Sequence, residues 1–165
     1  MTTVNAVPSD AAANSYLTLE EADLLMEGFS EQDAWDELDA DAQGQLLLEG
    51  TRAIDQYKNW GPVKVDGQRL AFPRSTDAPG LIPENVRLAL AEYVNYKVEG
   101  NLEPLKKLQA EGVTSASILG QSSNFAADLS GLPAGSRRHL DRTWAAYWPV
   151  SSANPGKCPD VSFYP

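Results

Sequence analysis

The sequence holds very little of the residue types from which covalent crosslinks and most catalytic sites are built. Its 165 residues include one cysteine and one histidine. Cys158 alone can form neither an internal disulfide nor a zinc site, and we expect a thiol with no assigned role. His139 lies on an expected helix without a G-x-S-x-G nucleophile motif anywhere in the chain, so we interpret it as a surface or interface residue.

Long apolar runs and cofactor motifs are missing as well. No run approaches the roughly 20 apolar residues of a membrane span, and the start shows no charged-then-apolar leader pattern. There is no P-loop, dinucleotide fingerprint or metal-helix motif. The acidic stretch from Asp33 to Asp41 does not have the ligand order of a calcium-binding loop. We therefore predict a protein that is not an enzyme, with no catalytic residues, no cofactor, no metal and no membrane contact.

Basic residues are scarce and the charge is unevenly distributed. The chain carries 13 Lys and Arg against 23 Asp and Glu, a net charge of −10. Thirteen of the acidic and two of the basic residues lie within residues 1–60, which leaves residues 61–165 close to neutral. Affinity for nucleic acid comes from clustered Lys and Arg that neutralise phosphates. The small groupings at 106–107 and 137–138 do not amount to such a surface, so tight nucleic-acid binding is disfavoured.

Helix signals dominate what is present, and we predict a mainly α fold of one domain. Thr18, Ser30 and Asp39 each precede an acidic first turn, which is typical of a helix N-cap. The third of these helices should cover about 40–59. Pro83 suits the first turn of a helix that runs to about Glu99. The apolar spacing of that helix predicts inward-facing positions at Val86, Ala89, Leu90, Tyr93 and Val94. A short helix should follow near 102–111, and "LPAGSRRHLDRTWAAYW" predicts a last one, with apolar residues spaced by four.

The segment "GPVKVDGQRLAFPRSTDAPG" differs from the helical parts. Asp66-Gly67 between short segments indicates a protruding hairpin or loop that includes Phe72, and any strand at 70–72 must end at Pro73 or lie on an edge. Arg74 could bind a phosphate or carboxylate, but a local salt bridge or cap contact is the interpretation we favour. Further on, the Ser-rich "VTSASILGQSSNFAAD" predicts one or two short edge strands.

Three parts of the chain are distinguished by composition. Residues 1–14 should be an irregular arm, 15–148 the helical domain, and 149–165, with four prolines, an extended tail. The tail's Val161, Phe163 and Tyr164, together with Trp144 and Trp148 of the last helix, are the candidate interface residues, because aromatic residues dominate protein interfaces. The aromatic residues Tyr93, Trp144 and Trp148 could instead stack on bases, but their helical spacing favours a place in the core or at a protein interface.

The ordered set of these segments resembles a known family. "SYLTLEEADLL", "WDEL" with "AQGQLLLEGTRAIDQY", "RLAFPR" and "IPENVRLALAEYV" are followed by a Ser-rich strand region and a Leu-Pro helix. This order, over about residues 14–148, resembles the head–tail adaptor (connector) proteins of long-tailed bacteriophages. Some of these carry the label of DnaT-like single-stranded-DNA-binding proteins. The tail after Trp148 and the low Val and Tyr content of the strand region depart from the family pattern.

The resemblance implies a structural virion protein of the neck, assembled in the host cytoplasm. About a dozen copies would form a ring between the portal protein and the stopper or tail. Genomic DNA would pass through the lumen without tight binding, consistent with an acidic wall. The alternative is a DnaT-like single-stranded-DNA-binding replication factor, which would need a basic groove with stacking aromatic residues. An uncharacterised enzyme is a third and weaker interpretation.

Overall fold

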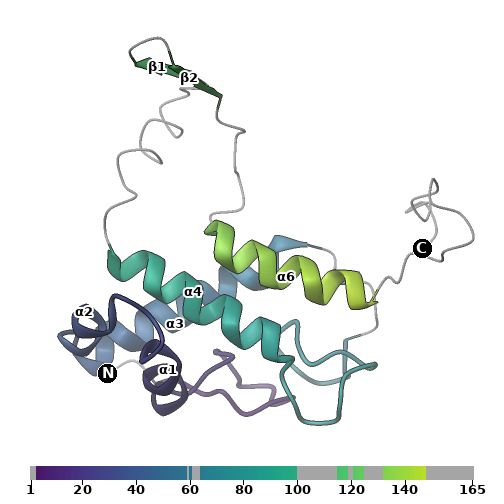
Figure 1. The fold of residues 1–165 in the computed structure, drawn as a ribbon. Coiled ribbons are helices and arrows are strands. Elements are labelled where there is room, and N and C mark those ends of the chain that lie inside the picture. The colour runs from purple at the N-terminus through teal and green to yellow at the C-terminus, as the bar shows by residue number, and fades with distance from the viewer. Residues whose placement is uncertain are drawn as a thin grey trace, which may run out of the picture.

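The computed structural model describes residues 3–58, 60, 64–99, 115–118, 121–124 and 132–147. Within these ranges the chain forms five helices and one pair of strands (Figure 1). In chain order they are α1 (Leu19–Met26), α2 (Gln32–Asp36), α3 (Ala40–Tyr57), α4 (Glu84–Glu99), β1 (Ser115–Ile118), β2 (Gln121–Asn124) and α6 (Ala134–Tyr147). The prediction of a mainly α fold is confirmed.

Two of the three predicted helix caps are confirmed. Thr18 and Glu21 form a reciprocal capping box at the start of α1, and the Asp39 carboxylate accepts from the Ala42 amide at 2.8 Å at the start of α3. The predicted Ser30 cap is wrong: the N-cap residue of α2 is Glu31, without a side-chain cap bond, and the Ser30 hydroxyl contacts the Glu31 carboxylate at 3.2 Å instead.

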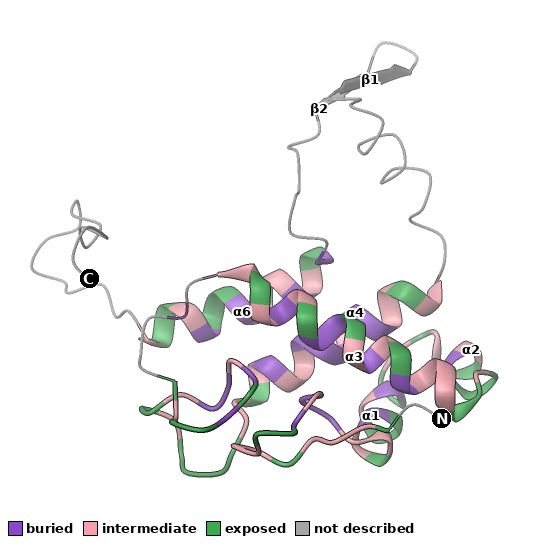
Figure 2. Ribbon diagram, turned by 180° about the vertical axis from the view of Figure 1, so that it is seen from behind, coloured by how far each residue is buried: buried purple, intermediate pink, exposed green. Residues whose placement is uncertain are grey.

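Helix α4 is the centre of the bundle. It packs against α6 and α3 along its length and also touches α1 and α2, so the other four helices surround it (Figure 1). Buried residues recur along α3, α4 and α6 (Figure 2). All the α4 positions predicted to turn inward are buried: Val86, Ala89, Leu90, Tyr93 and Val94. This match confirms the phase of the helix that the apolar spacing predicted.

Burial of a single tryptophan fixes the short helix α2. The Trp35 side chain is fully buried, and its indole N–H donates to the Asp23 carboxylate on α1 at 2.8 Å. The Gln43 amide on α3 donates to the Trp35 carbonyl at 3.1 Å. Because a helix of five residues has little stability of its own, these contacts with α1 and α3 hold it in place.

The predicted strands of the Ser-rich segment occur as β1 and β2, which pair antiparallel with Ser115 opposite Asn124 and Ile118 opposite Gln121. That β1 and β2 are edge strands stays a prediction. That a hairpin protrudes from the helical bundle also stays a prediction. The expected helix near 102–111 and the tail lie outside the described residues. None of the helices in the described ranges combines the length and apolar character needed to cross a membrane.

The hairpin predicted around Asp66 and Gly67 is reduced to a turn. Gly67 has a φ of 81°, a left-handed conformation that glycine adopts without strain. A single backbone bridge joins Lys64 to Arg74, and residues 70–72 form no strand. The predicted hairpin is therefore not confirmed, and the contacts of residues 70–73 with other parts of the chain explain why no strand forms there.

Candidate functional site

Side chains form hydrogen bonds with the backbone groups of residues 70–73 that would otherwise be free to pair with a neighbouring strand. The Gln68 amide donates to the carbonyls of Leu70 and Pro73, at 2.9 and 2.8 Å. The Ala71 amide donates to the Asp55 carboxylate at 3.3 Å, and the Phe72 amide donates to the Tyr16 hydroxyl, also at 3.3 Å. Because these backbone groups already have hydrogen-bond partners, residues 70–73 form an irregular segment and no β-ladder. We call this segment the crossing.

Tyr16 and Asp55 form the polar centre of this crossing. The Tyr16 hydroxyl donates to the Asp55 carboxylate, which joins the end of the N-terminal arm to helix α3. Burial raises the pKa of Asp55, although the hydrogen bond from Tyr16 acts in the opposite direction. Burial also raises the pKa of Tyr16, and the neighbouring Asp55 charge adds to this effect. A buried tyrosine and carboxylate that satisfy each other are typical of a structural contact.

Arg74 lies at the exit of the crossing, where the chain turns back towards α4. Its amide donates to the Asp77 carboxylate at 2.6 Å, and the Asp77 amide donates to the Arg74 carbonyl at 3.0 Å. Its guanidinium lies 5.6 Å from the centre of the Phe72 ring, and burial lowers its pKa. These local contacts fit the cap interpretation of Arg74 better than an open anion site.

The same turn fixes the last helix. The Tyr147 hydroxyl contacts both Asp77 carboxylate oxygens, at 2.8 and 2.9 Å, and its ring stacks on Phe72 with the centroids 6.2 Å apart. Phe72 also packs edge-on against Trp60 and Tyr16, at 4.8 and 5.8 Å. Phe72 is therefore the centre of an aromatic cluster that joins the arm, the crossing and α6.

The remaining candidate residues fall into separate places. Asp66 and Gly67 are exposed at the turn. Trp144 is half-buried on α6 with the Lys58 ammonium 5.1 Å from the centre of its ring. His139 is half-buried and its Nδ1 lies 3.3 Å from the Asn85 side-chain oxygen. The other interface candidates, Trp148, Val161, Phe163 and Tyr164, and also Cys158, lie outside the described residues, so their interface role stays a prediction.

A groove opens between the N-terminal arm and the loop that leads into α4. It has a volume of about 640 Å³ and is lined by the arm residues 3–8, by residues 80–82, and by the starts of α1 and α4. Sequence analysis did not identify it. Its walls come from segments about 75 residues apart, and no local motif predicts that these segments meet.

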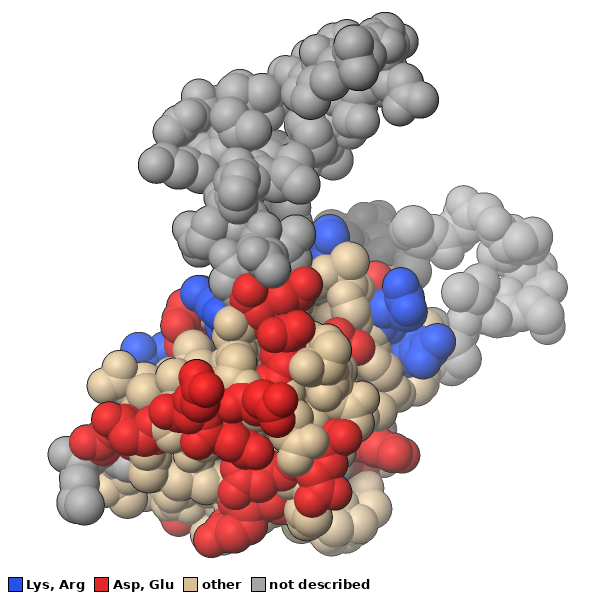
Figure 3. Space-filling view, turned by 60° about the vertical axis from the view of Figure 1, so that its left-hand side comes forward, with Lys and Arg blue, Asp and Glu red and all other residues tan. Residues whose placement is uncertain are grey.

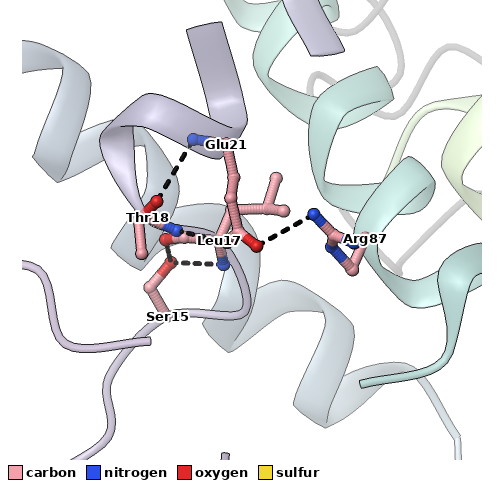
Figure 4. Close-up of polar contacts among 5 residues, drawn as sticks. All are labelled: Ser15, Leu17, Thr18, Glu21 and Arg87. Carbon is pink, nitrogen blue, oxygen red and sulfur yellow. Dashed lines mark hydrogen bonds and ion pairs between the residues drawn. The ribbon is translucent and has the colours of Figure 1, made fainter. Parts of the chain in front are cut away.

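Figure 4 shows polar contacts at the start of α1, where Thr18, Glu21 and Arg87 line this groove. One Glu21 oxygen accepts from the Thr18 amide at 3.0 Å, and the other pairs with the Arg87 guanidinium at 3.0 Å (Figure 4). The Ser15 hydroxyl donates to the Leu17 carbonyl at 2.8 Å and accepts from its amide at 3.2 Å. Glu21 thus caps α1 and ties it to α4 along one side of the groove.

Acidic side chains dominate the outer face of α1, α2 and the start of α3. Those exposed to solvent are Glu20, Asp23, Glu27, Asp33, Asp36, Glu37 and Asp39. Figure 3, in which the side of the molecule that bears α2 comes forward, shows red across most of that face and blue mainly at its margins. Among the described residues, no three His, Cys, Asp or Glu side chains are arranged to hold a metal ion. This face is therefore negatively charged, and its described residues form no metal-binding cluster.

Comparison with known proteins gives one match. No curated protein and no solved structure matches the chain. Residues 3–121 match the family described as "Putative DnaT-like ssDNA binding protein". The matched range includes the capped helices, the Phe72 crossing and the whole of α4, and it covers more than half of the sequence. The chain belongs to this family.

Proposed function

We propose that this chain is a structural, non-enzymatic head–tail adaptor of a tailed bacteriophage. About a dozen copies would form a ring between the portal protein and the stopper or tail, and the genome would pass through its lumen. The proposal rests on the resemblance of the ordered segments and on one feature of the surface: the described residues expose many carboxylates, whereas every described aromatic residue is buried or half-buried. Such a surface suits a wall past which DNA must move without being held.

The burial of the aromatic side chains is the main structural support for the adaptor role over single-strand binding. Half of the described aromatic residues are buried and the other half are half-buried. The buried ones are Tyr16, Trp35, Trp60, Phe72 and Tyr93. Proteins that bind single strands stack bases on exposed aromatic rings along a basic groove. In the described part of the chain five rings lie in the core and most of the half-buried ones pack against it, so little aromatic surface is left for stacking.

The basic residues lead to the same conclusion. Three of them pair with carboxylates: Lys58 with Asp141, Arg87 with Glu21, and Lys97 with Glu49. The exposed basic residues of the described ranges come from α3, the 64–69 loop, α4 and α6, and one face of the molecule is mainly acidic (Figure 3). Pairing with carboxylates lowers the charge that a phosphate backbone would meet.

Single-stranded-DNA binding is the second candidate, and the description of the matching family favours it over the adaptor role. The two candidates differ in a measurable property. A single-strand-binding protein should bind an oligonucleotide of about 30 nucleotides, longer than the roughly 4–16 nucleotides that one binding fold covers. Its affinity should fall steeply with salt, because each phosphate contact releases counterions.

Two experiments test the proposal. A band-shift titration of the full chain with that oligonucleotide should show no saturable complex near physiological salt. A saturable, salt-sensitive complex would replace the adaptor role with the second candidate. Mass spectrometry of purified virions should find the chain in the particle, and electron microscopy should place it at the neck. Finding it only in the infected cell's replication fraction would refute the adaptor role.

A further inference from the structure

Exposed apolar side chains in the described part of the chain gather at the groove. Three large apolar residues are strongly exposed: Val7 (58%), Leu24 (68%) and Leu81 (63%). Val7 and Leu81 line the groove, one on each wall, whereas Leu24 lies on α1 outside it. Apolar residues that line both walls of a concave surface indicate a site for an apolar ligand.

The C-terminal segment of the chain starts close to this groove. Tyr147, the last residue of α6, bonds to Asp77, and Asp77 precedes the groove residue Gly80 by three positions. Three residues extend over at most about 11 Å. The 13 residues from Trp148 to Val161 extend over up to about 45 Å. The segment therefore starts near the groove and is long enough to enter it.

The composition of residues 149–165 suits a shallow apolar groove. The segment contains Val150, Val161, Phe163 and Tyr164, with four prolines and one residue of each charge, so its net charge is zero. A neutral segment avoids repulsion by an acidic protein. Proline restricts the backbone to extended conformations, and proline-rich segments consequently dock in grooves at a low cost in entropy.

We propose that the groove binds residues 149–165 of the same chain, with Phe163 and Tyr164 covering Val7 and Leu81. The covalent link of residues 149–165 to α6 favours binding to the groove of the same chain over binding to that of a second copy. A segment tethered within reach of its site has an effective concentration in the millimolar range, far above that of a second copy in a micromolar solution. This docking does not depend on the adaptor role, because it follows from the groove and the tether alone.

The single cysteine gives a direct test. Cys158 lies within the segment, so a nitroxide can be attached there without any substitution. In the full ¹⁵N-labelled chain, the amide signals of Val7, Leu81 and Ile82 should lose intensity several-fold relative to the reduced, diamagnetic sample. Leu81→Asp should restore them. Leu24→Asp, the same change at an equally exposed leucine away from the groove, should leave the loss as in the parent.

Three outcomes would overturn the proposal. The first is full intensity at the groove in the spin-labelled parent, and the second is an undiminished loss in Leu81→Asp. The third is a loss that appears in a mixture of ¹⁵N-labelled unmodified chain with unlabelled, spin-labelled chain, which would assign the segment to a second copy. If Leu81→Asp did not fold, Phe163→Ser would serve, because it changes no described residue and should equally restore the groove signals.

Discussion

Gly50 of α3 lies close against Leu90 and Tyr93 of α4, and a single methyl group there should destabilise the protein. A Cβ atom at Gly50 would lie 2.5 Å from Leu90 Cδ1 and 2.6 Å from Tyr93 Cδ1. Carbon atoms in contact are normally about 3.5–4.0 Å apart. Leu90 is fully buried and Tyr93 is 2% exposed, so neither side chain can move aside without displacing others.

Two opposing effects set the size of the change in Gly50→Ala. Alanine is favoured over glycine inside a helix by about 0.8–1.0 kcal/mol. Overpacking a well-filled core costs roughly 1–3 kcal/mol. The net free energy of unfolding should fall by about 1 kcal/mol, which corresponds to a decrease in Tm of roughly 2–4 °C in a chain of this length. Gly50→Val adds two further methyl groups at the same contact and should cost clearly more.

Gly135 on α6 provides the matched control. A Cβ atom there would meet the Glu92 carboxylate at 2.3 Å, but Glu92 is half-buried and its flexible end can turn away. Gly135→Ala should therefore leave stability within about 0.5 kcal/mol of the parent or raise it. Urea unfolding followed by circular dichroism would measure all three variants. A Gly50→Ala protein as stable as the parent would refute the close packing of α3 against α4.

Other expected results follow from burial, titration and the tail. Ile54→Asp or Leu90→Asp should unfold the domain, because an unpartnered buried charge costs several kcal/mol, whereas Leu24→Asp on the surface should melt like the parent. Asp55 has a raised pKa when folded, so the folded state holds its proton more tightly than the unfolded chain. The stability of the parent relative to Asp55→Asn should therefore decrease as the pH rises from below 3.8, and a constant difference across urea titrations would contradict this. Removal of residues 149–165 should preserve helical content and Tm but prevent joining to portal-bearing heads in an in vitro assembly assay; equal assembly would exclude a role for the tail in binding the portal.

The sequence was informative wherever local chemistry determines the structure. Thr18 and Asp39 act within their own helical turns, and the spacing of apolar residues on α4 fixed its buried face. The prediction of an N-cap at Ser30 was wrong because α2 is too short for a capping residue to determine where the helix begins. Burial of Trp35 against α1 and α3 decides it instead, and this contact depends on how the helices pack.

The crossing at 70–73 could not be predicted for a related reason. A turn at Asp66-Gly67 next to alternating residues satisfies every local requirement of a hairpin. The backbone groups of this segment are bonded instead to Asp55 and Tyr16, which are 16 and 56 positions away in the sequence. Such partners leave no periodic signal, and the groove between the arm and the 80–82 loop escapes sequence analysis in the same way.

The long-range contacts also show how the segments of the chain depend on one another. Phe72 packs against Tyr16 on the arm side and against Tyr147 at the end of α6, and Asp77 holds Tyr147 just before the chain forms the groove wall. The path of residues 70–82 therefore sets both the position of the groove and the point where the C-terminal segment leaves the bundle. A partner that bound this segment would act through Tyr147, which Asp77 and Phe72 hold against the crossing.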